Sequence, residues 1–404
     1  MSNKTKTPLV PTLRFPQFKN SDEWSPQDLG DCLDYLQPTE YLVNSTAYND
    51  KHETPVVTAG KTFILGYTNE TEGVFNEPLP VIIFDDFTTA SQFVDFPFKA
   101  KSSAMKILLA KKNANIKFLY ESMQQIDYEV GAHGRHWISS YSRIKVAVPE
   151  PSEQQKIADC LSSLDELIAA QARKVVALKI HKKGLMQQLF PREGETQPRL
   201  RFPEFRNAGE WEVCELGNVS DVRDGTHDSP SFFSTGRALV TSKNLRSDGT
   251  LDLENVNLIS EEDYSQINKR SRVSIGDILF GMIGTIGNPV LVKSDGFAIK
   301  NVALIKEVGA LSNSFLVQLL QSGYVAAIFA VLNTGNSQKF IALGKIRGLP
   351  VPVPSLPEQQ LIADCFTSLD TLITAATQDL ETVKTHKKGL MQQLFPPVDN
   401  EVPA

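Results

Sequence analysis

Two long stretches of the chain repeat apolar residues at alternating spacings of four and three positions. Sustained over five heptads, this pattern predicts the seam of a coiled coil and two helices of about 38 residues, each roughly 57 Å long. A Ser-x-x-Gln/Glu pattern at each start fits a capping box, and Pro191 and Pro396 stop the helices. The seam residues expected to form the helix and partner interface are Ile157, Leu161, Leu164, Ile168, Leu185 and Leu189, then Ile362, Phe366, Leu369, Ile373, Leu390 and Leu394.

A helix with such a seam exposes a long apolar stripe unless it has a partner, and the other stretch is the obvious partner. A compact chain with two equivalent halves favours antiparallel pairing, with the variable domains at opposite ends and related by a two-fold axis. Gly184 and Gly389 lie inside the predicted helices at a cost of about 1 kcal/mol each. They indicate either close approach of the two backbones or simple tolerance. The His-Lys-Lys runs beside them either bind phosphate or a partner, or only favour the helix C-termini.

The long helices belong to an internal repeat. Residues 153–191 and 358–396 match without a gap at 25 of 39 positions, including eleven consecutive identities. The Leu-Arg-Phe-Pro sequence at 13–16 returns at 200–203, each time followed by Phe, Asn, Glu and Trp. The segments between these matches share little beyond their tails. The chain therefore reads as a fixed frame with two exchangeable domains, the product of duplication or of a later recombination.

This repeat predicts the domain boundaries. We expect an N-terminal frame strip (1–30), a first variable domain (31–150), a central long helix (151–191), a repeated strip (192–217), a second variable domain (218–355), a C-terminal long helix (356–396) and a tail (397–404). Short strands are predicted at 55–60, 80–86, 237–241 and 277–281, and a helix at 314–332. The fold class is therefore α/β (mixed α+β), two domains joined by two long antiparallel helices.

Composition limits the classes of protein. The 404 residues are 41% apolar and 8% aromatic, as in a folded protein of two or three domains. No apolar stretch approaches the ~20 residues that cross a bilayer. The polar first residues are not followed by the apolar segment of a secretory signal peptide, so we expect a cytoplasmic protein. The four cysteines lack metal-site spacing and read as structural thiols. A protein that binds nucleic acid by electrostatic attraction alone is usually basic, whereas the net charge of this chain is −6.

Local polar clusters nevertheless carry the side chains that bind phosphates and read base edges. Any one such cluster is more often a solvated face, but two of them occupy the matching tails of the domains, at 133–137 and 333–339. The candidate DNA-binding residues are Lys61, Lys99, Lys101, Ser102, His133, Arg135 and His136 in the first domain, and Arg223, His227, Lys243, Asn244, Arg246, Lys300, Asn336, Gln338 and Lys339 in the second.

No catalytic constellation is recognisable in the sequence. The Gly284–Gly287 run lacks the GxGxxG pattern, and Asn288-Pro289-Val290 lacks the aromatic residue of an adenine-methylating motif. Asp85-Asp86 suggests a Mg²⁺ site, although a structural or DNA-contacting use is favoured. We therefore expect a non-catalytic chain that binds neither a metal nor a cofactor itself.

The combination of motifs resembles the specificity subunit of type I restriction–modification systems. The resemblance covers nearly the whole chain, and the first domain departs from it, with Phe84-Asp85-Asp86-Phe87-Thr88 in place of a Gly-Asp-Ile-Leu element. The segments that carry it are 200–205 with Trp211 and Leu216-Gly217, 349–360 with Ile362-Ala363, 388–395, 276–279 and 284–287.

The resemblance implies a DNA reader in which each domain is a target-recognition domain for one half of a bipartite, asymmetric site. The long helices would set the spacer and dock two methylation subunits, and two restriction subunits would join the full complex. If the half-site centres lie about one turn apart, the span of roughly 34–36 Å is within reach of such helices. S-adenosylmethionine, ATP and Mg²⁺ are expected on the partner subunits, which would also share the neutralisation of phosphates.

Two other readings remain open from the sequence. One is a coiled-coil scaffold or adaptor without sequence-selective DNA binding. The other is a self-sufficient nuclease or methyltransferase, which the missing motifs disfavour.

Overall fold

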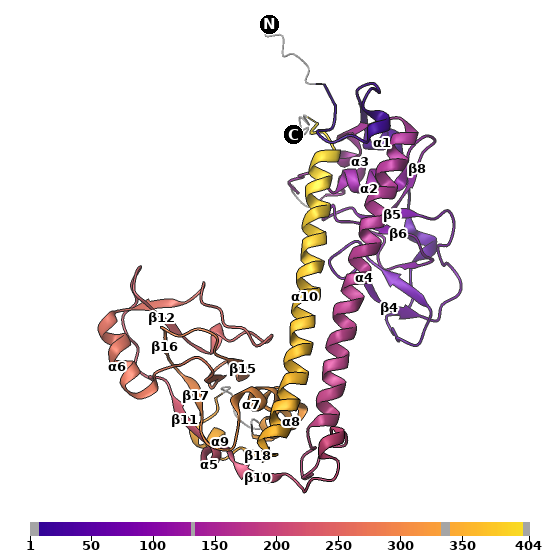
Figure 1. Cartoon of the computed structure of the whole chain (residues 1–404). Helices are drawn as coiled ribbons and strands as arrows, with labels where there is room; N and C mark the ends of the chain where they lie inside the picture. Colours follow the sequence, from indigo (N-terminus) through magenta and orange to yellow (C-terminus); the bar gives the residue numbers. More distant parts are fainter. Residues whose placement is uncertain (1–7, 131–133, 333–339, 399–404) are drawn as a thin grey trace. The chain divides into compact units, whose positions relative to one another are not determined.

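The computed structural model describes residues 8–130, 134–332 and 340–398. Contacts within the chain define two compact units, the first of residues 1–172 with 378–404 and the second of residues 173–377. Each unit therefore combines one variable domain with parts of both long helices (Figure 1).

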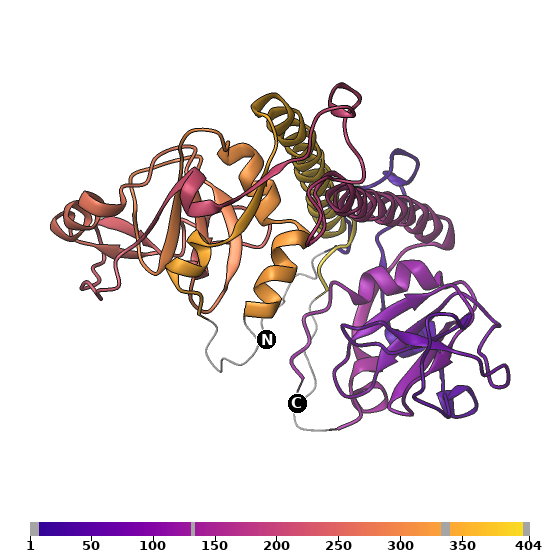
Figure 2. The ribbon, with the colours of Figure 1, turned by 90° about the horizontal axis from the view of Figure 1, so that it is seen from below.

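The two long helices are α4 (Pro151–Leu189) and α10 (Leu356–Leu394), each a continuous run of 39 residues. In the first unit Ile157 and Leu161 of α4 share a core with Leu394, and in the second unit Leu189 shares a core with Ile362. The helices therefore run antiparallel in both units (Figure 1), and Figure 2 views them from below. This confirms the predicted fold class. Among the described residues, no helix is long and apolar enough to cross a membrane.

The complete seam occupies positions 157, 161, 164, 168, 171, 175, 178, 182, 185 and 189 of α4 and positions 362, 366, 369, 373, 376, 380, 383, 387, 390 and 394 of α10. All twenty positions are buried or partly buried. Gly184 and Gly389 behave differently, since a Cβ added at either residue would meet no described atom within 4 Å. Their interpretation as points of close backbone approach is therefore wrong, and simple tolerance of glycine explains them.

The first domain contains two small sheets. In the central strand β5, Val81 and Ile83 face one core while Ile82 and Phe84 face the other, the two-residue period of a strand buried on both faces. The four-stranded antiparallel sheet has the order β2 (Leu33–Leu36), β8 (Met105–Ala110), β5 (Val81–Asp85), β6 (Ser91–Val94), and the three-stranded sheet has the order β4 (Ile64–Thr68), β3 (Thr54–Val57), β7 (Lys99–Ala100). The helices are α1 (Leu29–Cys32), α2 (Ile116–Met123) and α3 (His136–Ser139).

The second domain repeats this topology strand for strand, although the two sequences share little. Its central strand β14 also alternates, with Ile278 and Phe280 in one core and Leu279 in another. The four-stranded order is β11 (Ser220–Asp224), β17 (Val302–Glu307), β14 (Ile278–Gly281), β15 (Gly287–Leu291), and the three-stranded order is β13 (Asn257–Ile259), β12 (Arg237–Val240), β16 (Ala298–Ile299). The helices are α5 (Leu216–Val219), α6 (Glu261–Ser271), α7 (Asn313–Leu320), α8 (Gly323–Leu332) and α9 (Leu343–Arg347).

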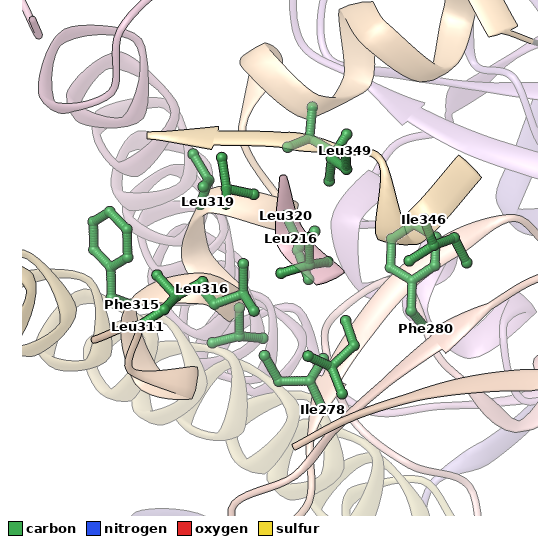
Figure 3. Close-up of a cluster of buried hydrophobic side chains, with 14 of the residues drawn as sticks. Leu216, Ile278, Phe280, Leu311, Phe315, Leu316, Leu319, Leu320, Ile346 and Leu349 are labelled. Atoms are coloured by element: carbon green, nitrogen blue, oxygen red, sulfur yellow. The ribbon is translucent and has the colours of Figure 1, made fainter. Parts of the chain in front are cut away.

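The core of the second unit forms where α7 packs between its sheet and the start of α10. In Figure 3, Leu316, Leu319 and Leu320 point into a cluster that also holds Leu216 and residues of β14. The helix predicted at 314–332 is in fact the pair α7 and α8, because the chain turns between them at Gln321 and Ser322. The Ser322 hydroxyl donates to the Leu319 carbonyl at 2.6 Å.

The frame strips join their domains to the long helices in the same way in both units. Each strip contributes one strand of a two-stranded antiparallel sheet. These pairs are β1 (Ser25–Asp28) with β9 (Lys145–Val148), and β10 (Glu212–Glu215) with β18 (Pro350–Val353). Short 3-10 turns complete the fold at η1 (Pro16–Phe18), η2 (Pro38–Tyr41), η3 (Tyr141–Arg143), η4 (Pro203–Phe205) and η5 (Ser242–Asn244).

A buried ion pair anchors each strip to the start of a long helix. Arg14 donates to both carboxylate oxygens of Glu153, at 2.8 and 2.7 Å, and Arg201 does the same to Glu358, at 2.6 and 2.7 Å. Helix α4 already begins at Pro151, so Ser152 lies inside its first turn rather than at the capping position. The capping-box interpretation is therefore wrong for α4. Ser355 directly precedes α10, as that interpretation requires, but the Glu358 carboxylate that would complete the box accepts from Arg201.

Candidate nucleic-acid interface

Two lysines occupy equivalent places in the two domains. Lys101 follows β7 and donates its backbone N–H to Val57 at 3.1 Å, and Lys300 follows β16 and donates to Val240 at 2.9 Å. Both side chains are partly exposed. The Lys101 ammonium lies 5.8 Å from the centre of the Tyr48 ring, whereas the Lys300 ammonium donates to the Ser229 hydroxyl at 2.6 Å. Each domain therefore presents a lysine ammonium at the same edge, but the neighbouring side chains differ between the two domains.

The tail of each domain is held against the end of the central strand. The N–H of His136 donates to the Asp86 carbonyl at 2.8 Å, and the N–H of Ile341 donates to the Met282 carbonyl at 2.9 Å. This contact places the exposed Arg135 beside the end of β5. Four predicted site residues lie outside the described residues: His133, Asn336, Gln338 and Lys339.

A polar cluster surrounds the loop that follows β11. His227 contacts Asn301 Oδ1 through Nδ1 at 2.7 Å and Asp224 Oδ2 through Nε2 at 2.9 Å. Arg270, at the end of α6, pairs with the same Asp224 carboxylate. The loop and α6 border a hollow of about 610 Å³ that is also lined by Ser229 and Lys269. The structure thus brings His227 and Lys300 together with basic residues of α6.

The imidazole of His227 carries a positive charge more readily than an ordinary histidine. Its pKa is raised by the hydrogen bond with Asn301, then by the hydrogen bond with Asp224 and the charge of that carboxylate, while burial and the positive charge of Arg270 oppose these effects. Because both ring nitrogens face oxygen acceptors, only the protonated ring can donate to both. The cluster therefore favours the imidazolium form.

The other predicted interface residues differ in how far their side chains are exposed and already paired within the domain. Arg223 pairs with Asp221 at 2.5 Å and Arg246 with Asp252 at 3.1 Å, so each guanidinium already faces a carboxylate, while both side chains remain half-exposed. Lys61, Ser102 and Lys243 are exposed, and the Ser102 hydroxyl accepts the N–H of Ala104 at 3.1 Å.

Three predicted DNA-binding side chains are buried, and this removes them from the candidate interface. Lys99 is 2% exposed and donates to the Glu72 carbonyl at 2.6 Å. Asn244 is 6% exposed and uses its amide in η5 and toward the Asn255 carbonyl. His136 is also 6% exposed and contacts the Tyr128 hydroxyl. Each makes internal hydrogen bonds that the linear sequence does not reveal.

The Asp85-Asp86 pair does not form a shared metal site. Asp85 Oδ1 accepts the N–H groups of Phe87 and Thr88 at 2.9 and 2.8 Å, while Asp86 is fully buried against Lys106. In the part of the chain that the structure describes, no group of three or more His, Cys, Asp or Glu side chains is arranged to hold a metal ion.

Asp224, Arg270 and Asn301 were not predicted from the sequence as site residues. The basic run at 269–272 was a visible signal for Arg270. Asp224 and Asn301 have no such signal, because their roles depend on β11 and β17 lying side by side.

Comparison with known proteins supports one family. The sequence profile of the family described as "Type I restriction modification DNA specificity domain" matches residues 21–179 and 208–385. The chain is 33% identical over 379 residues to the type I restriction enzyme EcoR124I/EcoR124II specificity subunit of Escherichia coli, covering 89% of each chain. It is 26% identical over 270 residues to the MjaVIII specificity subunit of Methanocaldococcus jannaschii, covering 63% of this chain and 62% of that one.

A solved structure shows the same fold. The type I restriction–modification S subunit from M. genitalium matches with a TM-score of 0.64 at 14% identity, over 96% of this chain and 100% of that one. The duplicated topology, the antiparallel frame and the two matched sequence regions agree with one another. The chain belongs to the family of type I restriction–modification DNA specificity subunits.

Proposed function

We propose that each of the two domains binds one half of a bipartite, asymmetric DNA site and that the chain itself catalyses no reaction. The observation that carries this proposal is the pair of equivalent lysines, Lys101 and Lys300. They occupy the same place in the shared topology, but the side chains around them differ between the two domains. An equivalent cation can contact the phosphate backbone in both domains, and the different side chains around it would read different bases. Lys101 has Tyr48 beside it, whereas Lys300 lies in the loop cluster that holds His227.

The proposal assigns the long helices two tasks, setting the spacer and docking two methylation subunits. Support comes from exposed residues that are identical in both helices. Gln155, Asp159, Ser163 and Leu167 are exposed, lie four positions apart on one stripe, and recur 205 positions later, again exposed. The hydrogen bond from Gln155 to Asp159 also recurs, at 2.7 Å in α4 and 2.8 Å in α10.

Burial cannot explain identity at exposed positions, but a partner that binds twice can. Exposed Leu167 and its equivalent Leu372, at 43% and 54% exposure, offer such a partner apolar surface. A neighbour in fold, at a TM-score of 0.52 and 15% identity, comes from a study of complex assembly in the type I restriction–modification system. Two restriction subunits would join the full complex, and S-adenosylmethionine, ATP and Mg²⁺ would bind to the partners rather than to this chain.

The test is to co-express the chain with a type I methylation subunit from the same organism and to map modified adenines across the host genome. A split motif with a fixed gap and one modified adenine in each half is the expected result. A stable complex that modifies no defined motif would instead favour the scaffold reading. Turnover by the purified chain alone would contradict the non-catalytic role.

A further inference from the structure

A charged pair is buried in the middle of the first domain. Lys106 in β8 and Asp86 at the end of β5 are both 0% exposed, and the Lys106 ammonium lies 3.4 Å from Asp86 Oδ2. Neither of these two atoms has a hydrogen-bond partner among the described residues, and the ammonium lies 5.1 Å from the centre of the Tyr35 ring. Such a pair is weak evidence for stability, because removing both charges from water costs about as much as their attraction returns.

The second domain shows that the sheet does not need the charges. Asp85 lies opposite Met105 in the first domain, and Gly281 lies opposite Val302 in the second. The next residue on each strand is therefore equivalent, which places Met282 where Asp86 stands and Ala303 where Lys106 stands. Met282 is 2% exposed and Ala303 is 0% exposed. The same strand pairing thus forms around an apolar pair.

The carboxylate does have a second contact, with the tail of its own domain. Asp86 Oδ1 accepts the N–H of Trp137 at 2.8 Å, in addition to the backbone contact between Asp86 and His136. At the equivalent position, Met282 accepts a hydrogen bond from the tail through its backbone carbonyl and has no side-chain carboxylate. The first domain therefore holds its tail by one more hydrogen bond, which the Trp137 N–H donates to the Asp86 carboxylate and for which the Met282 side chain has no carboxylate.

This extra bond acts on a segment that presents a DNA-binding candidate. Arg135 is exposed and immediately precedes the two anchored residues, His136 and Trp137. Its carbonyl also accepts the Ser139 hydroxyl at 2.7 Å, so both polar groups of the peptide bond that follows Arg135 are held. An arginine reads a base by two parallel hydrogen bonds, which requires a fixed backbone position.

We propose that Asp86, with Lys106 as its buried countercharge, is a positioning residue that orients Arg135 for recognition of the first half-site. This inference rests on the proposed function, in which the first domain reads one half of the DNA sequence. It assigns Asp86 no contact with DNA.

The experiment compares two double variants in the complex with methylation subunits. D86M/K106A copies the apolar pair of the second domain and removes the acceptor for the Trp137 N–H. D86N/K106M, the matched control, also removes both charges but keeps a carbonyl acceptor in that place. Binding and methylation are measured on duplexes in which either half-site is changed, and the midpoint of thermal unfolding is measured alongside.

D86M/K106A should lose roughly 10- to 100-fold of its selectivity for the first half-site and none for the second, because a lost bidentate contact has about that effect. D86N/K106M should retain selectivity for both. R135A should reproduce the loss caused by D86M/K106A. Equal first-half selectivity in the two double variants, or normal selectivity in R135A, would overturn the inference.

Three further outcomes remain decisive. If D86M/K106A does not fold, R135A together with D86N/K106M still tests the assignment, because the first must lose and the second must keep first-half selectivity. If the unaltered complex recognises no split motif, the proposed function fails. If it recognises one and D86M/K106A does so equally well, only the positioning role fails.

Discussion

The ammonium group of Lys182 lies 2.6 Å from a carboxylate oxygen of Asp370, a residue 188 positions later in the chain. Lys387 and Asp165 make the equivalent contact in the first unit, at 2.7 Å. In each helix the lysine occupies a seam position where an apolar residue is the rule. A charged residue in a seam lowers stability but favours the one register in which it finds its partner. We infer that these two pairs set the register of the antiparallel helices.

Removing one charge of such a pair should weaken the fold. Lys182→Ala should lower the free energy of unfolding by about 1–2 kcal/mol, less than for a fully buried pair because Asp370 remains 42% exposed. Chemical denaturation measures this change. Lys183→Ala is the matched control, since Lys183 is exposed on the same helix and should shift stability by less than about 0.5 kcal/mol. Equal effects would show that the seam pair has no special role.

The Lys387–Asp165 pair also predicts a dependence on pH. Burial alone would raise the pKa of Asp165, but hydrogen bonds from Lys117 and Lys387 outweigh burial and hold the pKa below its ordinary value of 3.8. A carboxylate with a lower pKa in the folded state stabilises the fold above its unfolded pKa. That contribution is lost as the pH falls through the folded value.

Asp165→Asn removes this titration. Below about pH 4, the free energy of unfolding of the variant should therefore fall less steeply with acid than that of the unaltered chain. Urea denaturation at a series of pH values gives both slopes. Parallel slopes would contradict the account of Asp165.

The two arginine anchors should respond alike to one conservative change. Lysine carries the same charge as arginine but cannot bind both carboxylate oxygens at once, so Arg14→Lys should release the strip from the start of α4. Hydrogen exchange should then rise at residues 8–24. Arg201→Lys is its internal replicate and should raise exchange at residues 195–211. Unchanged protection in both variants would mean that the strips are held by other contacts.

The His227 cluster makes a prediction for nuclear magnetic resonance. Because the hydrogen bonds with Asn301 and Asp224 raise the pKa of His227, its titration midpoint should lie above the ordinary value of 6.5. A raised folded pKa stabilises the loop below about pH 6.5, and this stabilisation is lost as the pH rises through the folded value.

Asn301→Gly isolates the largest of these contributions. Asn301 has a φ of 55°, so glycine removes the side-chain acceptor without backbone strain. The pKa of His227 should fall in this variant. A midpoint that does not move would show that Asn301 does not influence the ring.

The strongly periodic parts of the fold could be predicted from the sequence. Five heptads of seam residues determine α4 and α10 almost to the residue, because the pattern is local and repeated. The strands at 81–85 and 278–281 were also predicted, since runs of β-branched and aromatic residues are local signals. Helix α6 was not predicted because Tyr264 and Ile267 are the two large apolar side chains in an otherwise polar sequence, although Ser260 caps its start by accepting the Asp263 N–H at 3.0 Å.

The site was less predictable, because a polar side chain on the surface and one inside the protein can look alike in sequence. Lys99 was expected to bind DNA, but its ammonium pairs with the Glu70 carboxylate and donates to the Glu72 carbonyl within the domain. The pairing of Asp86 with Lys106 depends on two strands lying side by side. The two domains share a topology because equivalent strand positions are buried in both, although the residues at most of those positions differ.

The central claim, that each domain independently reads one half of the DNA sequence, is tested most directly by exchanging one domain. The frame offers equivalent junctions, because Leu29 donates to the Ile144 carbonyl at 3.0 Å just as Leu216 donates to the Leu349 carbonyl at 2.9 Å. A chain in which residues 31–144 replace residues 218–349 would carry the first domain twice. Its complex with the methylation subunits is then used to map modified adenines.

If each domain reads DNA independently, the exchanged chain should modify a split motif whose two halves carry the same sequence on opposite strands, since the helices of the frame run antiparallel. The unaltered chain, mapped in parallel, should give two different halves. An unchanged motif in the exchanged chain, or a continuous motif in either chain, would contradict independent reading by the two domains.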